Sequence, residues 1–191
     1  MSQALALAKK RHGRVRPNPS VGSIVVKDEK VVGKGFHEIS GKDHAEVIAL
    51  KDAGLLAKGA DLYVTLEPCN HQGKTPPCTN AIISAGISNV YIAMKDPNPL
   101  VNGLGIEYLK KNGINVTSGI MEEEAKKLNL GFLNRMIKSR PYIRSKIAIS
   151  LDGKTSLFNG HSQWITSEAS RADVQKWRLK SCATLTGKGT I

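Results

Sequence analysis

Short β-branched segments alternate with helix-spaced segments along most of the chain. The apolar residues Val47, Ile48 and Leu50 recur at helical spacing after Asp43, which we expect to cap that helix. Strands that alternate with helices pack as a sheet covered on both faces, so the pattern predicts an α/β domain. We expect strands over residues 21–26, 31–36, 62–66, 90–94 and 114–117, and helices over residues 3–12, 44–57, 78–85, 106–111 and 122–138.

A second segment begins near Ser139, Arg140 and Pro141. Beyond this point, residues 142–149 predict one strand and residues 168–180 predict one helix. One strand and one helix in about fifty residues are too few to bury an independent core. We therefore divide the chain into a domain over residues 1–139 and an incomplete one over residues 140–191, in which Cys182 is expected to be a small buried residue.

The chain is basic, with 28 Lys and Arg against 16 Asp and Glu and a formal net charge of +12. Such an excess favours an anionic partner, such as nucleic acid, an acidic membrane or a phosphorylated substrate. The positive charges are scattered, and no aromatic residues interleave with the densest run, Lys9-Lys10-Arg11, as they do in single-strand binding sites. A basic soluble protein without such a partner remains an equal alternative.

The sequence also bears on the compartment and on the use of cysteine. No apolar run is long enough to span a membrane, and residues 1–8 lack the basic region and the cleavage site of a secretory signal. We therefore expect a cytoplasmic protein. Three cysteines in such a chain predict metal binding or simple burial rather than a disulfide framework.

The residues that carry chemistry are His44, Glu46, Cys69 and Cys78. One imidazole and two thiolates give Zn²⁺ three protein ligands and leave the fourth tetrahedral position for water, as in catalytic sites. Zinc lowers the pKa of such a water from about 15.7 to about 7. Glu46 lies two residues after His44, from where its carboxylate could reach that water and act as base and then as acid. The pattern predicts hydrolytic removal of an amino group from an amidine-like ring carbon.

The order His-x-Glu, Pro-Cys and a second Cys is the signature of zinc deaminases, in which two residues separate the cysteines. Here eight residues separate Cys69 from Cys78. With this longer loop, the chain resembles the deaminase half of the bifunctional riboflavin-biosynthesis deaminase/reductase family. The segments that carry the resemblance are residues 17–22, 44–47, 64–71, 73–78 and 96–99.

The resemblance implies a cytidine-deaminase-like fold, a three-layer α/β/α sandwich with a mixed central sheet. It also implies removal of the C2 amino group of 2,5-diamino-6-(5-phosphoribosylamino)pyrimidin-4(3H)-one as ammonia, a step of riboflavin synthesis. By the same resemblance, His44, Cys69 and Cys78 hold one Zn²⁺ per chain and Glu46 is the proton shuttle. The other implied contacts are the pyrimidine for Asn18 and His37, the ribose phosphate for His71, Lys74 and Thr75, and the ribose hydroxyls for Asp96 and Asn98.

These residue types fit their implied roles on chemical grounds, but each has another explanation. Lys74 is a point charge suited to phosphate, although a lysine in a polar loop is often only solvated. Asn18 offers a donor and an acceptor to a pyrimidine edge, although between two prolines it could simply shape a turn. Asp96 and Asn98 are also typical turn residues, and His37 could be a satisfied residue at a strand end.

Residues 146–154 and 162–167 resemble the start of the family's reductase domain, which has a dihydrofolate-reductase-like fold and uses NADPH. The resemblance implies that Lys146, Ser162 and Arg178 face substrate and that Ala148, Trp164 and Thr190 face the nucleotide. Because the sequence stops before most of that domain, we expect no reductase activity from it, and NADPH binding only if a complete reductase domain is supplied.

Two other functions remain open at this stage. Related zinc enzymes flip bases out of strands, so a tRNA-type nucleic-acid deaminase is one alternative, although a phosphate anchor at Lys74 suits a mononucleotide better. The other is a zinc-stabilised partner of a separate reductase, although a structural site needs no carboxylate such as Glu46. We expect a small phosphorylated pyrimidine as partner, neither nucleic acid nor a membrane. We also expect a homo-oligomer, because an incomplete β-α segment exposes apolar edges.

Overall fold

The computed structural model describes residues 1–10 and 15–188, and the chain forms two compact units, Met1–Tyr142 and Ile143–Ile191. The strands of the first unit are β1 (Gly22–Lys27), β2 (Lys30–Phe36), β3 (Asp61–Leu66), β4 (Asn89–Met94) and β5 (Asn115–Ser118). Its helices are α1 (Ser2–Lys9), α2 (Ala45–Ala53), the 3-10 turn η1 (Gly54–Ala57), α3 (Cys78–Ser84), α4 (Leu104–Lys111), α5 (Glu122–Leu128) and α6 (Leu130–Lys138). No helix in the described part of the chain is both long enough and apolar enough to cross a bilayer.

The strands form one mixed sheet, as the resemblance implied, and their order in it is β2-β1-β3-β4-β5. The strand β1 pairs antiparallel with β2 and β3, whereas β3, β4 and β5 run parallel. Asp28 and Glu29 connect β1 to β2 with φ values of 48° and 60°, the left-handed backbone that a two-residue hairpin turn requires. Because β3 and β4 are parallel, their carboxyl ends lie at the same edge of the sheet, where ligands bind in open α/β folds.

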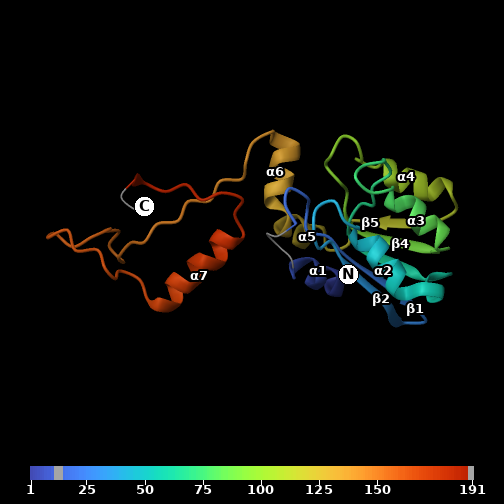
Figure 1. The fold of residues 1–191 in the computed structure, drawn as a ribbon, viewed down its shortest axis with the longest axis horizontal. Helices are drawn as coiled ribbons and strands as arrows, with labels where there is room; N and C mark the ends of the chain where they lie inside the picture. The colour runs from blue at the N-terminus through green and yellow to red at the C-terminus, as the bar shows by residue number, and fades with distance from the viewer. Residues whose placement is uncertain (11–14, 189–191) are drawn as a thin grey trace. The chain divides into compact units, whose positions relative to one another are not determined.

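Helices cover both faces of this sheet, which confirms the three-layer expectation (Figure 1). The helices α2, α3 and α4 pack on one face, and α1 and α5 pack on the other. The core of the first face includes Val25, Ala49, Leu62, Ile82, Ile92 and Leu109. The core of the second includes Ala4, Leu5, Leu7, Ile24, Met94 and Ala125. Neighbouring β1 residues, Ile24 and Val25, enter opposite cores, as the alternation of a strand buried on both faces requires.

Two glycines of β2 bring α2 against the sheet. A Cβ atom on Gly35 would lie 2.1 Å from the carbonyl oxygen of Ala45, and one on Gly33 would lie 2.2 Å from that of Ala49. No side chain fits in these gaps, so the backbone of α2 rests directly on β2. This close approach fixes the first turn of α2, which carries His44 and Glu46.

Two expectations for the first unit are wrong in detail. The helix expected over residues 122–138 is two helices, because Asn129 adopts φ −116° and ψ 28° and uses its side chain outside the helix. The N-cap position of α2 is His44 rather than Asp43, and the His44 side chain makes no capping hydrogen bond. The carboxylate of Asp43 instead pairs with Lys51, with 2.7 Å between Oδ2 and Nζ.

The second unit contains α7 (Glu168–Leu179), which confirms the helix expected over residues 168–180. The Ser167 side chain accepts a hydrogen bond from the Ser170 N–H and caps this helix. The strand expected over residues 142–149 is wrong, because a strand needs a hydrogen-bonded neighbour and the described residues of this unit contain none. The expected burial of Cys182 is also wrong, since its side chain is exposed.

Replacing Gly35 with Ala should destabilise the first unit, because the new Cβ atom would force α2 off β2. Overpacking of this kind costs about 1–3 kcal/mol. Gly131→Ala is the matched control, since nothing lies within 4 Å of its Cβ position and the change lies in α6. Alanine in a helix is favoured over glycine by about 1 kcal/mol. Urea unfolding compares the two variants with the parent, and a Gly35→Ala variant as stable as Gly131→Ala would contradict the close packing of α2.

Candidate functional site

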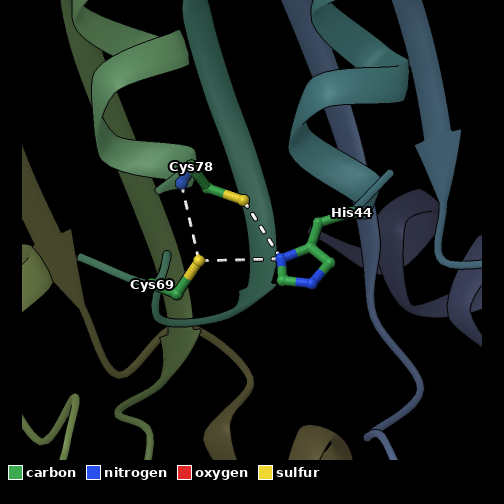
Figure 2. A group of neighbouring side chains, drawn as sticks. All are labelled: His44, Cys69 and Cys78. Carbon is green, nitrogen blue, oxygen red and sulfur yellow. Dashed lines mark hydrogen bonds between the residues drawn. The ribbon is translucent and has the colours of Figure 1, made fainter. Parts of the chain in front are cut away.

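His44, Cys69 and Cys78 meet at the sheet edge where β3 and β4 end (Figure 2). His44 is the N-cap residue of α2, and Cys78 is the first residue of α3, where the sequence predicted that helix to begin. Cys69 lies in the loop that follows β3. The ligand atoms of the three side chains lie within 4.8 Å of one another, so the fold gathers residues from three separate segments.

The geometry of this cluster fits a zinc ion. The Nδ1 atom of His44 lies 3.2 Å from Cys78 Sγ and 3.6 Å from Cys69 Sγ, and Figure 2 shows this edge of the ring facing both sulfurs. Bonds of about 2.3 Å to sulfur and about 2.0 Å to nitrogen at a tetrahedral angle place such ligands about 3.6 Å apart. The donor set of one imidazole and two thiols is also one that zinc prefers, so these residues could hold it.

Hydrogen bonds among the two thiols and the imidazole shift the pKa of each group. The hydrogen bond from Cys78 lowers the pKa of Cys69, and the same bond raises the pKa of Cys78. The hydrogen bond to Cys69 raises the pKa of His44. The Cys78 backbone N–H also donates to Cys69 Sγ at 3.4 Å. A thiolate held in this way favours capture of a divalent cation, which displaces the remaining protons.

Glu46 lies beside this cluster in the first turn of α2, with only 4% of its surface exposed. Burial raises the pKa of its carboxyl to about 7, and the negative charge of Cys69 contributes. No basic side chain neutralises this carboxyl by an ion pair among the described residues. A buried carboxyl without such a partner is a common feature of sites that transfer protons.

A cleft of about 390 Å³ opens over His44, Glu46 and Cys69. Its volume lies within the range of about 300–1,000 Å³ that is typical of small-molecule sites. The fold brings every residue predicted to contact the deaminase substrate to its wall, although their individual roles stay predictions. These residues are Asn18, His37, His71, Lys74, Thr75, Asp96 and Asn98.

Asn18 and His37 form a hydrogen-bonded pair in this wall. The His37 Nδ1 atom lies 3.1 Å from the carbonyl oxygen of Asp43, which can only accept, so Nδ1 carries the proton. Burial lowers the pKa of His37, which favours the neutral ring. Its Nε2 atom therefore accepts from Asn18 Nδ2 at 3.0 Å. Among the described residues, no hydrogen bond reaches Asn18 Oδ1, which leaves this oxygen as an acceptor for a ligand.

The loop between the two cysteines brings His71, Lys74 and Thr75 to the cleft. The Gly73 N–H donates to the carbonyl oxygen of Thr75 at 3.2 Å and closes a tight turn around Lys74. Within the described chain, the Nδ1 atom of His71 is buried and has no hydrogen-bond partner. An unpaired buried nitrogen costs free energy, so a ligand that bonds to it is favoured.

Asp96 and Asn98 use part of their side chains within their own turn. The Asn98 N–H donates to Asp96 Oδ1 at 2.8 Å, and the Leu100 N–H donates to Asn98 Oδ1 at 3.1 Å. Burial raises the pKa of Asp96 to about 6. Both residues still line the cleft, so the turn orients them toward it while one oxygen of each is occupied.

Glu67 has a structural role that the sequence pattern did not reveal. Its buried carboxylate accepts four backbone N–H groups, from Asp96 and Gly103 at Oε2 (3.2 and 3.0 Å) and from Gly105 and Ile106 at Oε1 (3.1 and 3.2 Å). Gly103 is the N-cap of α4, so the carboxylate satisfies the free N–H groups of that helix from another segment. It thereby ties the Asp96 turn to the loop that carries Cys69.

Helix α6 supplies a wall of the cleft that sequence reasoning missed. Phe132, Arg135 and Met136 line the cleft from this helix. The Arg135 Nη2 atom donates to the carbonyl oxygen of Pro17 at 3.0 Å, and its guanidinium lies 5.9 Å from the Phe132 ring centroid. Their helical spacing was visible in the sequence, but nothing local indicated that this helix reaches the cleft.

The residues expected to serve a reductase lie in the second unit. The side chains of Lys146, Ser162, Trp164 and Arg178 are exposed and that of Ala148 is half-buried. Thr190 lies outside the described residues. Arg178 Nη1 donates to Gln175 Oε1 at 3.4 Å within α7. The cleft described above is lined by residues of the first unit, and the roles of these second-unit residues stay predictions.

Two family models match the chain. Residues 1–94 match the cytidine and deoxycytidylate deaminase zinc-binding region, and residues 141–191 match the RibD C-terminal domain. The riboflavin biosynthesis protein RibD of Aquifex aeolicus is 53% identical over 191 residues, which are 100% of this chain and 54% of that protein. The chain thus spans about half the length of the curated relatives that it matches.

Solved structures are similar over nearly the whole chain. RibD of Acinetobacter baumannii has a TM-score of 0.90 and 52% identity, over 94% of this chain and 51% of that one. The diaminohydroxyphosphoribosylaminopyrimidine deaminase/5-amino-6-(5-phosphoribosylamino)uracil reductase of Thermotoga maritima has a TM-score of 0.88 and 47% identity, over 93% of this chain and 51% of that one. The likeness confirms the expected cytidine-deaminase-like fold of the first unit.

The cluster predicts one zinc ion per chain, and Cys78→Ala should reduce the zinc content well below one, because a two-ligand site holds zinc weakly. Cys182→Ala is the matched control, since this cysteine is exposed in the second unit and lies outside the cluster. Elemental analysis after gel filtration measures the zinc content of both variants and of the parent. Zinc retained by Cys78→Ala, or lost from Cys182→Ala, would contradict the assignment.

Proposed function

The chain belongs to the RibD family of riboflavin biosynthesis proteins, and from this premise we propose that its first unit deaminates 2,5-diamino-6-(5-phosphoribosylamino)pyrimidin-4(3H)-one by hydrolysis. The products are ammonia and 5-amino-6-(5-phosphoribosylamino)uracil. Because the chain spans about half of its relatives, the proposal covers this step alone. The observation that carries it is the buried Glu46 carboxyl beside the His44, Cys69 and Cys78 cluster in one cleft.

In this proposal His44, Cys69 and Cys78 hold zinc, and Glu46 moves the protons. Zinc in such a site supplies a nucleophile at neutral pH, because it lowers the pKa of water at its open position to about 7. Glu46 is suited to act on that water because it follows the ligand His44 by two residues in the same helical turn. Its burial excludes bulk water, which would otherwise compete for the proton.

The reaction needs two proton transfers, and in this proposal one carboxyl group performs both. Glu46 first takes a proton from the attacking water while the oxygen bonds to C2, and it passes this proton to the adjacent ring nitrogen. It then transfers the second proton of that oxygen to the amino nitrogen. The C2–N bond breaks, ammonia leaves, and the oxygen remains as the carbonyl of the uracil ring. One water is consumed for each ammonia released.

Substrate recognition in this proposal uses the two sides of the cleft. The free Oδ1 of Asn18 accepts an N–H of the pyrimidine, while His37 fixes the amide through its Nδ2. On the loop between the cysteines, Lys74 and Thr75 bind the phosphate, and the unpaired Nδ1 of His71 gives a further polar contact. The free oxygen of Asp96 and the amide of Asn98 bond to the ribose hydroxyls.

Replacing Glu46 with Gln should lower kcat by about 10²–10⁴-fold, because the amide keeps the size of the side chain but cannot shuttle protons. Zinc content should stay at one per chain. Glu38→Gln is the matched control, because Glu38 is an exposed carboxylate outside the cleft. Ammonia release from zinc-loaded protein measures kcat. Parental turnover by Glu46→Gln would contradict the proposed role. Ammonia release by the parent from an RNA stem-loop, and not from the pyrimidine, would show that the substrate is a nucleic acid instead.

Replacing Lys74 with Ala should raise KM for the phosphorylated substrate by about 10–100-fold, since a charged hydrogen bond contributes about 1.5–3 kcal/mol. The KM for the dephosphorylated analogue should stay unchanged. Lys42→Ala is the control for the loss of one positive charge near the cleft, because Lys42 is exposed and lies next to Gly41 of the cleft wall. Steady-state ammonia release with both substrates gives the KM values of the parent and of both variants. An equal loss for the two substrates would show that Lys74 does not bind the phosphate.

A further inference from the structure

We propose that Asn129, at the junction of α5 and α6, is a positioning residue for substrate recognition: it holds the loop of residues 17–20 so that Asn18 reaches the pyrimidine. The inference rests on the proposed function, because the base contact of Asn18 belongs to it. Asn129 does not line the cleft itself and was not indicated by the sequence pattern. Its action therefore has to pass through the loop.

The contact between Asn129 and the loop is a pair of opposed hydrogen bonds. The Ser20 N–H donates to Asn129 Oδ1 at 2.8 Å, and Asn129 Nδ2 donates to the Ser20 carbonyl oxygen at 3.0 Å. Both residues are buried, with 5% of their surface exposed. The side-chain amide thus pairs with the backbone of Ser20 as a neighbouring strand would. An aspartate could not replace it, because its second oxygen would face the Ser20 carbonyl.

The break between the two helices places this amide. Asn129 has a non-helical backbone, and its carbonyl oxygen accepts the Leu133 N–H at 2.9 Å, so α6 starts from the same residue. On its other side, α5 is anchored in the core of the second face through Ala125. A rigid helix thereby holds one end of the loop from a position 109 residues away in the sequence.

A second tether holds the other end of the loop. Arg135 on α6 donates to the carbonyl oxygen of Pro17 at 3.0 Å. Asn18 thus lies between two fixed backbone positions, Pro17 and Ser20, and its Nδ2 donates to His37. These restraints leave Oδ1 of Asn18 in a single orientation. Preorganised polar groups of this kind lower the entropy cost of binding a ligand.

A double-mutant cycle separates positioning from mere structural support. Asn129→Asp should raise KM about tenfold and leave zinc content at one per chain, because the misplaced loop weakens one base contact. In an Asn18→Ala background, the same change should alter KM less than about twofold, since the contact through which it acts is already lost. An equal loss in both backgrounds would overturn the proposal.

Asn134→Asp is the matched control, because it makes the same chemical change in α6, where Asn134 Nδ2 donates to the carbonyl oxygens of Arg140 and Pro141 instead. It should keep the parental KM. If the Asp variant of Asn129 does not fold, Asn129→Ser removes the amide without adding a charge and enters the same cycle.

Hydrogen exchange at the Ser20 amide gives a readout that needs no turnover. Asn129→Asp should accelerate this exchange at least tenfold, whereas Asn134→Asp should leave it at the parental rate. Unchanged exchange in Asn129→Asp would overturn the proposal. If the zinc-loaded parent released no ammonia, the proposed function would fail, while faster exchange in Asn129→Asp would still support the tether.

Discussion

The buried carboxylate of Glu67 is the interaction on which the arrangement of the cleft depends. A carboxylate away from water is tolerated only when its oxygens are paired, and four backbone N–H groups provide that pairing here. Three of them come from Gly103, Gly105 and Ile106 at the start of α4, and the fourth comes from Asp96. Because Glu67 lies two residues before Cys69, one side chain sets the position of the loop that carries Cys69 relative to the turn of Asp96. Gly105 completes this contact, since a Cβ atom there would lie 2.1 Å from the Pro68 carbonyl oxygen.

The chemistry of the site then follows from how ionisable groups are buried around this frame. Glu46 and Asp96 are both removed from water, yet they differ in how they are paired. Asp96 accepts a backbone N–H from its own turn, whereas Glu46 is hydrogen-bonded to its own backbone and to Cys78 of the metal cluster. The Asp96 carboxyl is thus held by its turn, and the Glu46 carboxyl lies against the metal cluster. Burying such groups costs stability, and this cost is typical of functional sites.

The sequence predicted the residues of the metal cluster and the cleft, and it missed most of those that position them. The zinc signature could be read because His44, Glu46, Cys69 and Cys78 have chemical identities that are rare in this order. The helical layers on both faces followed from the alternation of strands and helices, whereas the mixed sheet was implied by the family resemblance. Glu67, Asn129 and Arg135 could not be read, because an acidic, an amide or a basic residue is common at such places and their partners lie far along the chain. The strand predicted over residues 142–149 is absent for a related reason. Its residue pattern is that of a strand, but a strand forms only when a partner strand pairs with it.

The positioning residues also define how much of the chain the candidate site requires. The deaminase family model ends at residue 94, before Asp96 and Asn98 and before every cleft residue of α6. Helix α5 nevertheless packs in the same core as β4, and the junction that follows it holds the loop of Asn18. The zinc cluster is thus encoded within the matched region together with the cleft residues Asn18, His37 and Lys74, whereas the Asp96 turn and the α6 wall come from residues after it. The segment after β4 supplies the Asp96 turn and the α6 wall, whereas the loop with Cys69 and Cys78 supplies metal ligands. A fold with the same zinc signature can therefore accept a different substrate when the segment after β4 differs.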